Sequence, residues 1–334
     1  MCYQMAVLGT GGLGTMLGTQ IRRQPDAALV ALSDVSDESR RKAGETLDVP
    51  ADARYETLAE LLAEEALDAL VIATPHTLHY EQLLATLDRD CHVLCEKPLV
   101  TDLEEARDLV HRADDTEQVV MVGYQRHVEP EYRYAKRRWE PDGSAPSFIS
   151  AEIVEGWVDP NVGTWRMEPS LSGGGFIYDT GNHVVDAVLW TTGLTPATVR
   201  AEMDFEREGV DSRATVTIEF EGGQTAHLSF HADTPRVAER LQGWDERGGI
   251  RIEGREWGRR SITEIDEDGS ESEPYIGERD SAYENPRSKL DAFVAAIEGD
   301  EPVPATPRDA LRATAVTEAA YESARTDDPV DVDL

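Results

Sequence analysis

An aspartate and a histidine stand four residues apart in the stretch SGGGFIYDTGNHVVDAVLW, residues 172–190. Residues at this spacing share one face of a helix, so Asp179 can orient the imidazole of His183 or bind a hydroxyl group beside it. An imidazole with a pKa of about 6.5 can take a proton from an alcohol at neutral pH. We therefore expect an acid–base pair behind the glycine run 173–175, which lets the preceding loop fold against a ligand.

Structural explanations also fit this pair. An aspartate near the start of a helix is favoured by the helix dipole, and a histidine on a helix can be held only by packing. For Asp186, three residues beyond His183, a solvated or capping role is favoured over support of the imidazole.

Lys97 stands near the end of CHVLCEKP, residues 91–98, whose apolar residues predict a strand. Its ammonium group can donate a hydrogen bond to an oxygen on which negative charge develops. The chain has only four lysines, which argues for a functional role over a surface one: Lys42, Lys97, Lys136 and Lys289. With His183 as base, this set suits oxidation of an alcohol, in which a nicotinamide takes the hydride and the protein takes the proton.

A glycine motif opens the chain. The apolar residues 3–8 predict a strand, which runs into Gly9-x-Gly11-x-x-Gly14 and then an amphipathic segment. A second predicted strand ends at Asp34, 20 residues after Gly14. This is the dinucleotide-binding pattern: a tight turn, close approach of the backbone to a pyrophosphate, and a helix N-terminus facing the phosphates. We expect cofactor contacts from Gly9, Thr10, Gly11, Gly12, Leu13, Gly14 and Asp34.

The carboxylate of Asp34 can accept hydrogen bonds from the ribose hydroxyls and would repel a 2′-phosphate. It therefore favours NAD over NADP, although Arg40 and Arg41 follow closely and are expected a turn into the next helix.

Predicted strands and helices then alternate up to residue 125, which indicates a parallel sheet. Ligands of such sheets lie at the carboxyl ends of the strands. Three groups stand at those ends: Thr74-Pro75, Glu96-Lys97-Pro98 and Tyr124-Gln125-Arg126.

The rest of the chain has strand patterns at 147–157, 197–206, 214–232 and 248–258, with a hairpin turn at EGGQ, 221–224. The acidic stretch 264–274 is expected to be a loop, and 285–300 a helix. Trp157, Trp165 and Arg166 suit a polyhydroxylated substrate, since aromatic rings pack on apolar ring faces and a guanidinium binds oxygens in pairs.

The composition restricts the partners. With 334 residues and a net charge of −34, the chain suits two domains and resembles proteins adapted to high salt, in which ions screen self-repulsion. The same charge argues against binding nucleic acid or anionic membranes. No membrane span or signal peptide is expected, and three cysteines suit free thiols in the cytoplasm. No zinc spacing is formed by His76, His79, Cys91, His92 and Cys95, so no metal is expected.

Five motifs carry a family resemblance: GTGGLG, IATPHTLHY, CEKPLVTDLEEARDLV, VGYQRHVEPEY and GGGFIYDTGNHVVDAVLW. With a closing helix at 306–325, the chain resembles the glucose–fructose oxidoreductase, inositol dehydrogenase and MocA family along essentially its whole length. The resemblance implies an α/β Rossmann domain, residues 1–125, and a C-terminal α+β domain with a large, mostly antiparallel open sheet, residues 126–334.

The resemblance also implies site residues. Lys97, Asp179 and His183 would be catalytic. The cofactor would lie near Gly9, Gly11, Gly14, Asp34, Thr74, Pro75, His79, Glu96 and Lys97. From the strand-end group 124–126 we further expect Gln125 to contact the cofactor, and Arg126 to contact the substrate together with Asp179 and His183. His76 stands where many members have asparagine, near the nicotinamide ribose, and His127 follows Arg126 where an arginine or an aromatic residue is frequent.

The implied reaction is NAD(P)-dependent oxidation or reduction of a sugar, polyol or inositol-like compound, carried out by a homodimer or homotetramer. Two alternatives keep the fold. Some relatives retain NAD tightly and cleave glycosidic bonds through a transient keto-sugar. A metabolite sensor would bind NAD without turnover, although a sensor has no need of a base.

Overall fold

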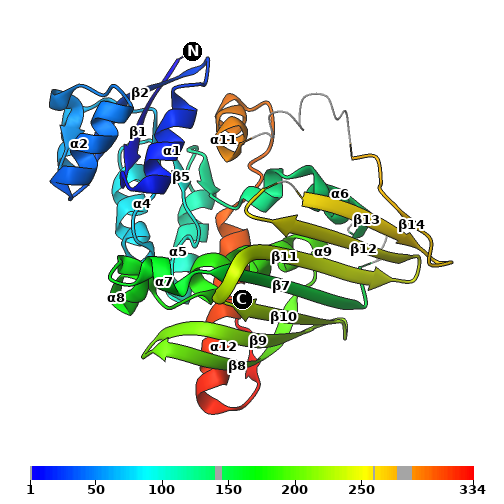
Figure 1. Ribbon diagram of the computed structural model, residues 1–334. Coiled ribbons are helices and arrows are strands. Elements are labelled where there is room, and N and C mark those ends of the chain that lie inside the picture. The colour runs from blue at the N-terminus through cyan, green and yellow to red at the C-terminus, as the bar shows by residue number, and fades with distance from the viewer. Residues whose placement is uncertain (1, 140–144, 259, 277–287) are drawn as a thin grey trace. The chain divides into compact units, whose positions relative to one another are not determined.

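The computed structural model describes residues 2–139, 145–258, 260–276 and 288–334 (Figure 1). The chain forms two compact units. The first holds Met1–Val100, Glu104–Gly123 and Arg287–Pro307, and the second holds Thr101–Leu103, Tyr124–Pro286 and Arg308–Leu334. The segment 287–307, which the sequence places with the second domain, therefore groups with the first. It is held there by backbone pairing, since the Val122 N–H donates to the Ala305 carbonyl at 2.9 Å.

The first unit contains a six-stranded parallel sheet in the order β3-β2-β1-β4-β5-β6. Its strands are β1 (Tyr3–Leu8), β2 (Ala27–Ser33), β3 (Arg54–Tyr55), β4 (Ala69–Ile72), β5 (His92–Cys95) and β6 (Val120–Val122). All residues of β4 are buried, as expected for a strand covered on both faces. The predicted Rossmann-like parallel sheet is confirmed.

Helices connect these strands (Figure 1): α1 (Gly12–Ile21), α2 (Asp37–Thr46), α3 (Leu58–Glu64), α4 (His79–Leu87) and α5 (Leu103–Asp114). The later segment of this unit adds α11 (Lys289–Glu298). Two 3₁₀ turns, η1 (Ala51–Ala53) and η2 (His76–Leu78), accompany them. The predicted helix 76–90 thus begins with a 3₁₀ turn. Of the predicted helix 285–300, residues 285–287 lie outside the described residues, and the remainder is α11, which begins at the capping box of Ser288 and Asp291.

The second unit contains a nine-stranded sheet in the order β14-β13-β12-β11-β7-β10-β9-β8-β15. Its strands are β7 (Phe148–Gly156), β8 (Pro196–Arg207), β9 (Val210–Phe220), β10 (Thr225–His231), β11 (Asp233–Asp245), β12 (Gly248–Arg255), β13 (Arg260–Asp266), β14 (Glu271–Ser272) and β15 (Val330–Asp331). Only β7 and β10 pair in parallel among the strand pairs of this sheet that the structure describes. The predicted mostly antiparallel sheet and its hairpin at 221–224 are confirmed.

Buried and exposed residues alternate along β9 and β10, so one face of this sheet is packed and the other is open. The expected loop at 264–274 is wrong in part, because β13 extends to Asp266 and β14 covers Glu271–Ser272. Strand β11 was not predicted either. In both places, charged residues on the open face of the sheet conceal the strand pattern.

Helices cover the packed face (Figure 1). They are α6 (Pro130–Trp139), α9 (Asn182–Thr192) and α12 (Pro307–Thr326), of which α12 corresponds to the predicted closing helix. Short turns carry the loops: η3 (Gln125–Val128), α7 (Val158–Asn161), η4 (Trp165–Met167), α8 (Pro169–Ser172) and η5 (Ile177–Gly181). α12 is fastened to β8 by a hydrogen bond from the Ala201 N–H to Ser323 Oγ, 3.0 Å long.

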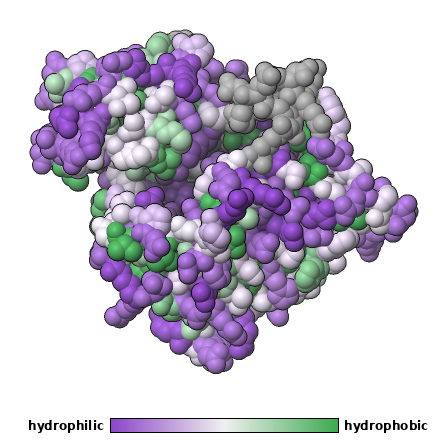
Figure 2. Space-filling view, in the orientation of Figure 1, coloured by the Kyte–Doolittle hydropathy of each residue, from purple (hydrophilic) through white to green (hydrophobic). Residues whose placement is uncertain are grey.

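Hydrophilic residues cover most of the face shown in Figure 2. No helix among the described residues is long and apolar enough to cross a membrane. Cys2 is exposed, Cys91 and Cys95 are buried, and all three are free thiols.

The net charge of −34 makes stability depend on salt. Raising KCl from 0.1 to 1 M shortens the Debye length from about 10 Å to about 3 Å, which weakens repulsion among surface carboxylates. We expect the thermal unfolding midpoint to rise by about 5 °C or more, roughly 1–2 kcal/mol for a protein of this size. Circular dichroism would measure it, with sucrose of equal osmolality as control. An unchanged midpoint in KCl would contradict the expectation.

Candidate active site

The glycine motif forms a tight turn against the end of β4. Gly9 has φ +87°, in the left-handed region, and a Cβ there would lie 2.6 Å from the carbonyl oxygen of Ala73. A Cβ on Gly14 would lie 1.8 Å from the carbonyl oxygen of Gly9. Only glycine fits at these two positions, which lets the start of α1 pack directly on the turn.

The N-terminus of α1 has the features of a phosphate site. Its N-cap, Gly11, makes no side-chain cap, and the first turn holds no acidic residue. A Cβ on Gly11 or Gly12 would meet nothing within 4 Å, so the backbone is approachable there. Free N–H groups and the positive end of the helix dipole suit an anion, and the loop therefore fits the pyrophosphate of a dinucleotide.

Asp34 holds this loop in place through hydrogen bonds. Its Oδ2 accepts from the Thr10 N–H at 2.6 Å and from Thr10 Oγ1 at 3.0 Å, and its Oδ1 accepts from the Ser36 N–H at 2.8 Å. Arg40 returns to the same place, donating from Nη1 to the Asp34 carbonyl at 2.6 Å. The carboxylate and a guanidinium thus stand together at the end of β2, the position at which the adenosine ribose is expected.

His79 joins two loops at the strand ends. It is fully buried, with Nε2 3.0 Å from the Thr74 carbonyl and Nδ1 2.9 Å from the Pro98 carbonyl. Burial lowers its pKa, while the surrounding carbonyls act in the opposite direction. Both ring nitrogens are occupied by the backbone, so His79 positions the Thr74-Pro75 and Glu96-Lys97-Pro98 loops, and its predicted contact with the cofactor stays a prediction. His76 is also buried, with its ring centroid 6.1 Å from that of His79.

Glu96, directly before Lys97, is buried and forms an ion pair with Lys289 of α11. Lys289 also lies 3.5 Å from the Gly123 carbonyl, so one ammonium joins α11, the strand end of β5 and the end of β6. The sequence analysis did not single out Lys289. Its rarity as one of four lysines was the available signal, but no local pattern indicates a partner 193 residues away.

In the second unit, the structure groups Asp179 with three residues that were predicted to face the substrate, Trp157, Trp165 and Arg166. The Oδ2 of Asp179 accepts from Trp157 Nε1 at 2.8 Å and from Arg166 Nε at 2.7 Å. The guanidinium of Arg166 stacks over the ring of Trp165, 4.4 Å from its centroid. Asp179 is buried and Arg166 is partly exposed, and the two form an ion pair at the edge of this cluster.

Asp179 and His183 were expected on one turn of an α-helix, but the structure places them in two different helical elements. Asp179 lies in the π-helical turn η5, where the Gly181 N–H donates to the Phe176 carbonyl at 2.8 Å, and His183 lies in α9. π-Helical turns inside helices are frequent at functional sites. His183 is buried in this structure, and its predicted role as the base stays a prediction.

A buried carboxylate holds the glycine run in place. Asp211 on β9 accepts from the Gly175 N–H at 3.1 Å and the Ile177 N–H at 3.0 Å, and the hydroxyl of Tyr321 donates to it. A Cβ on Gly175 would lie 2.3 Å from the Asp211 N, so the glycine permits a close approach that the sequence analysis read as loop freedom. Burial raises the pKa of Asp211 to about 6, against the lowering effect of these hydrogen bonds.

Two further expectations concern η3 and α9. Asp186 is buried and lies 3.0 Å from His127 Nε2, so the solvated or capping role is wrong. His127 stacks on Trp190 with centroids 4.1 Å apart. Arg126 is 1% exposed and pairs with Glu239, while Gln125 donates to Glu129 at 3.3 Å. The predicted ligand contacts of Arg126 and Gln125 stay predictions.

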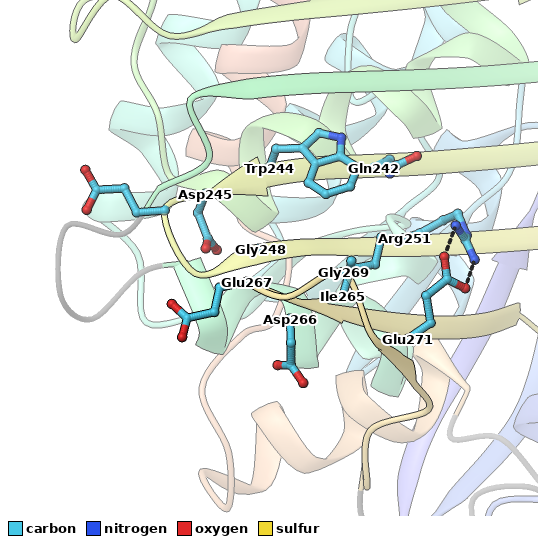
Figure 3. A pocket seen from close by; sticks show the side chains of 11 residues that line it. Gln242, Trp244, Asp245, Gly248, Arg251, Ile265, Asp266, Glu267, Gly269 and Glu271 are labelled. Atoms are coloured by element: carbon cyan, nitrogen blue, oxygen red, sulfur yellow. Dashed lines mark hydrogen bonds and ion pairs between the residues drawn. The ribbon is translucent and has the colours of Figure 1, made fainter.

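The hollow in Figure 3, about 520 Å³, lies at the turns of the β11–β12 and β13–β14 hairpins. Carboxylates of Asp245, Asp266 and Glu267 line it, while Arg251 is paired with Glu271. An acidic lining would repel nucleotide phosphates, and none of the predicted site residues lies there. Among the described residues, no three or more His, Cys, Asp and Glu side chains are grouped to hold a metal ion.

Comparison with known proteins gives matches along both units. The oxidoreductase family pattern of the NAD-binding Rossmann fold matches residues 3–124, and the pattern of its C-terminal alpha/beta domain matches residues 147–332. The chain is 28% identical over 342 residues to D-xylose 1-dehydrogenase (NADP(+)) 2 of Haloferax volcanii, covering 98% of this chain and 99% of that protein.

Two other matches agree. 1,5-Anhydro-D-fructose reductase of Ensifer adhaerens is 29% identical over 289 residues, 83% of each chain. The structure of an aldose-aldose oxidoreductase from Caulobacter crescentus, complexed with glycerol, has a TM-score of 0.84 and 21% identity, covering 99% of this chain and 100% of that one. At that identity the structure shows a shared fold.

The Lys289–Glu96 pair predicts a large effect of one substitution. Lys289→Met leaves a buried carboxylate unpaired and should lower the free energy of unfolding by roughly 3–5 kcal/mol. Denaturant unfolding would measure it, and adding Glu96→Gln should restore most of the loss. Lys42→Met is the control, because the Lys42–Glu38 pair is exposed and should contribute little to stability. Equal losses for the two lysine variants would contradict the assignment.

Asp211 predicts a pH effect with a definite sign. Its pKa in the folded protein, about 6, lies above the ordinary value of 3.8, so its contribution to stability is present at low pH and lost as pH rises through about 6. Relative to Asp211→Asn, which cannot titrate, the wild type should lose roughly 3 kcal/mol between pH 4 and pH 7. Denaturant unfolding of both proteins at each pH would measure the difference. A pH-independent difference would contradict the raised pKa.

Proposed function

The chain belongs to the oxidoreductase family of glucose–fructose oxidoreductase, inositol dehydrogenase and MocA, and we propose which of its residues carry out the reaction. It is an NAD(P)-dependent oxidoreductase that transfers a hydride between nicotinamide and an alcohol or ketone of a sugar, polyol or inositol-like compound. One observation supports the cofactor assignment above all: the N-terminus of α1 has no side-chain cap and is open to a ligand. The glycine turn before it is held by a hydrogen bond to Asp34.

Lys97, Asp179 and His183 form the catalytic group in this proposal. Bound nicotinamide supplies hydride acceptance or donation. His183 takes the proton of the reacting hydroxyl, and Lys97 donates a hydrogen bond to the same oxygen as negative charge develops on it. Asp179, whose Oδ2 accepts from Trp157 and Arg166, binds a neighbouring substrate hydroxyl. Trp165 and Arg166 add an aromatic face and donors for a polyhydroxylated substrate.

The same proposal extends to the preferred nucleotide, NAD. Oδ1 of Asp34 makes one hydrogen bond and has capacity for a ribose hydroxyl, while its charge disfavours a 2′-phosphate. Arg40 is the competing feature, because its guanidinium stands at the Asp34 carbonyl and could pair with that phosphate. The Haloferax relative is named for NADP(+), so the ratio of the two nucleotides is the quantity to measure.

We also propose that the protein is a cytoplasmic homodimer or homotetramer that is adapted to high salt. The open face of the nine-stranded sheet is the surface available for assembly, and the charge of −34 and the relative from Haloferax volcanii support the salt adaptation.

Catalysis is tested by substitution. His183→Ala and Lys97→Ala should each lower kcat by about 100-fold or more, because each removes a group that acts on the reacting oxygen. Formation of reduced nicotinamide from D-xylose and myo-inositol in 2 M KCl would measure it. His227→Ala and Lys42→Ala, both at exposed positions, are the matched controls.

Intact turnover in His183→Ala would remove the assigned base. A wild type that binds NAD but forms no reduced nicotinamide from any sugar would favour the NAD-retaining glycosidase, if cofactor stays bound on purification, or the sensor.

Cofactor choice is tested with the same assay. The wild type should show a higher kcat/KM with NAD than with NADP, and Arg40→Ala should increase that ratio further because the only guanidinium placed at Asp34 by the described residues is removed. Asp34→Ser should lower the ratio by about tenfold or more. Arg41→Ala is the control, since Arg41 pairs with the exposed Glu45. A wild-type preference for NADP would overturn the proposed cofactor.

A further inference from the structure

A tryptophan that the sequence analysis did not single out lies beside the proposed base. Trp257 occupies the turn between β12 and β13, and its ring centroid is 5.9 Å from that of His183, with the two planes tilted by 60°. The ring is 40% exposed, so it is only partly used in packing. On one side the guanidinium of Arg126 stands over it, 5.6 Å from the centroid.

The backbone of this turn is strained. Glu256 has φ +53° and Trp257 has φ +56°, in the left-handed region that bulky residues avoid. The other described non-glycine residues with positive φ are Asp48, Asp90 and Asp327, whose short polar side chains tolerate it. A strained residue costs about 1–3 kcal/mol and persists where the surroundings hold it, which is frequent at ligand sites.

Hydrogen bonds hold the turn on both sides. The Glu256 N–H donates to the Val237 carbonyl at 3.1 Å, the Gly258 N–H donates to the Arg255 carbonyl at 2.9 Å, and Arg260 Nη1 donates to the Gly258 carbonyl at 3.1 Å. The turn that presents Trp257 is therefore attached to β11 and to the first residue of β13.

Beneath the turn lies a buried ion network. Glu239 is 6% exposed, accepts from Arg260 Nε at 2.8 Å and Nη2 at 3.1 Å, and pairs with Arg126 as well. Burial would raise the pKa of Glu239, but the two arginines and the Tyr132 hydroxyl hold it at about 2. Glu239 thus stays ionised and holds Arg126, whose guanidinium lies 5.6 Å from the centroid of the indole.

We propose that Trp257 is the stacking platform for the ring of a cyclic sugar or cyclitol, placing a ring hydroxyl beside His183. The inference rests on the proposed role of His183 and narrows its substrates. A pyranose or inositol ring has a continuous C–H face that packs on an indole, whereas an open-chain polyol has no fixed face of this kind. A ring stacked on Trp257 would lie near the imidazole of His183, whose centroid is 5.9 Å from that of the indole.

Trp257→Gly separates this role from a structural one. Glycine accepts positive φ without strain, which offsets part of the lost packing of the indole, so the variant should remain folded with an unfolding temperature close to that of the wild type. Its KM for D-xylose or myo-inositol should rise about tenfold or more, with a smaller change in kcat and an unchanged KM for NAD. Trp257→Phe should keep most of the affinity. Trp244→Ala is the control, because Trp244 is 39% exposed but lies in a regular strand.

Open-chain and cyclic probes complete the test. The wild type should favour D-xylose or myo-inositol over xylitol, and Trp257→Gly should lose that preference. Calorimetric titration of the NAD-loaded protein makes the outcomes distinct: His183→Ala should bind the ring but not turn it over, whereas Trp257→Gly should lose binding. Turnover in His183→Ala would remove the proposed base and leave the binding result to stand. Unchanged KM in Trp257→Gly, or no ring binding by the wild type, would overturn the stacking platform.

Discussion

The second unit depends on one buried carboxylate. Asp211 reaches from the sheet to the Gly175 and Ile177 N–H groups, and Tyr321 of α12 donates to it as well. Sheet, closing helix and glycine run therefore meet at one acceptor. The π-helical turn that carries Asp179 begins just after the glycine run. The contacts of Asp211 therefore position this turn without the help of a substrate. Because Asp211 is fully enclosed, this anchor combines hydrogen bonding with a cost of burying charge.

In the first unit, carboxylates likewise hold loops in place. Asp34 holds the glycine turn through Thr10, and Glu96 holds the loop of Lys97 to α11 through Lys289. In a chain with 66 acidic and 32 basic side chains, most carboxylates have no cation to pair with. Three cations are nevertheless placed at buried carboxylates: Lys289 at Glu96, and Arg126 with Arg260 at Glu239. Others, such as Lys42 at Glu38 and Arg41 at Glu45, pair at the surface.

Local patterns were sufficient for much of this architecture. The glycine turn, the alternation of strands and helices and the EGGQ hairpin were predictable because each is determined by neighbouring residues. Trp157, Trp165, Arg166 and Asp179 were expected near the substrate, and the structure groups them. Groups fixed by distant partners were not predictable. Lys289, Asp211 and Trp257 depend on contacts across the chain, the π-helical turn has no local signal, and Asp186 was misread because its partner His127 is 59 residues away.

Both outermost strands of the nine-stranded sheet, β14 and β15, are two residues long. Each covers only two residues of its neighbour, so most of β8 and β13 is not covered by these strands. At molar salt the repulsion between acidic surfaces is screened, and charge no longer keeps molecules apart. Protection against edge-to-edge pairing then has to come from geometry, and the Ala201 N–H of β8 is one edge group already bonded within the chain, to Ser323 Oγ of α12.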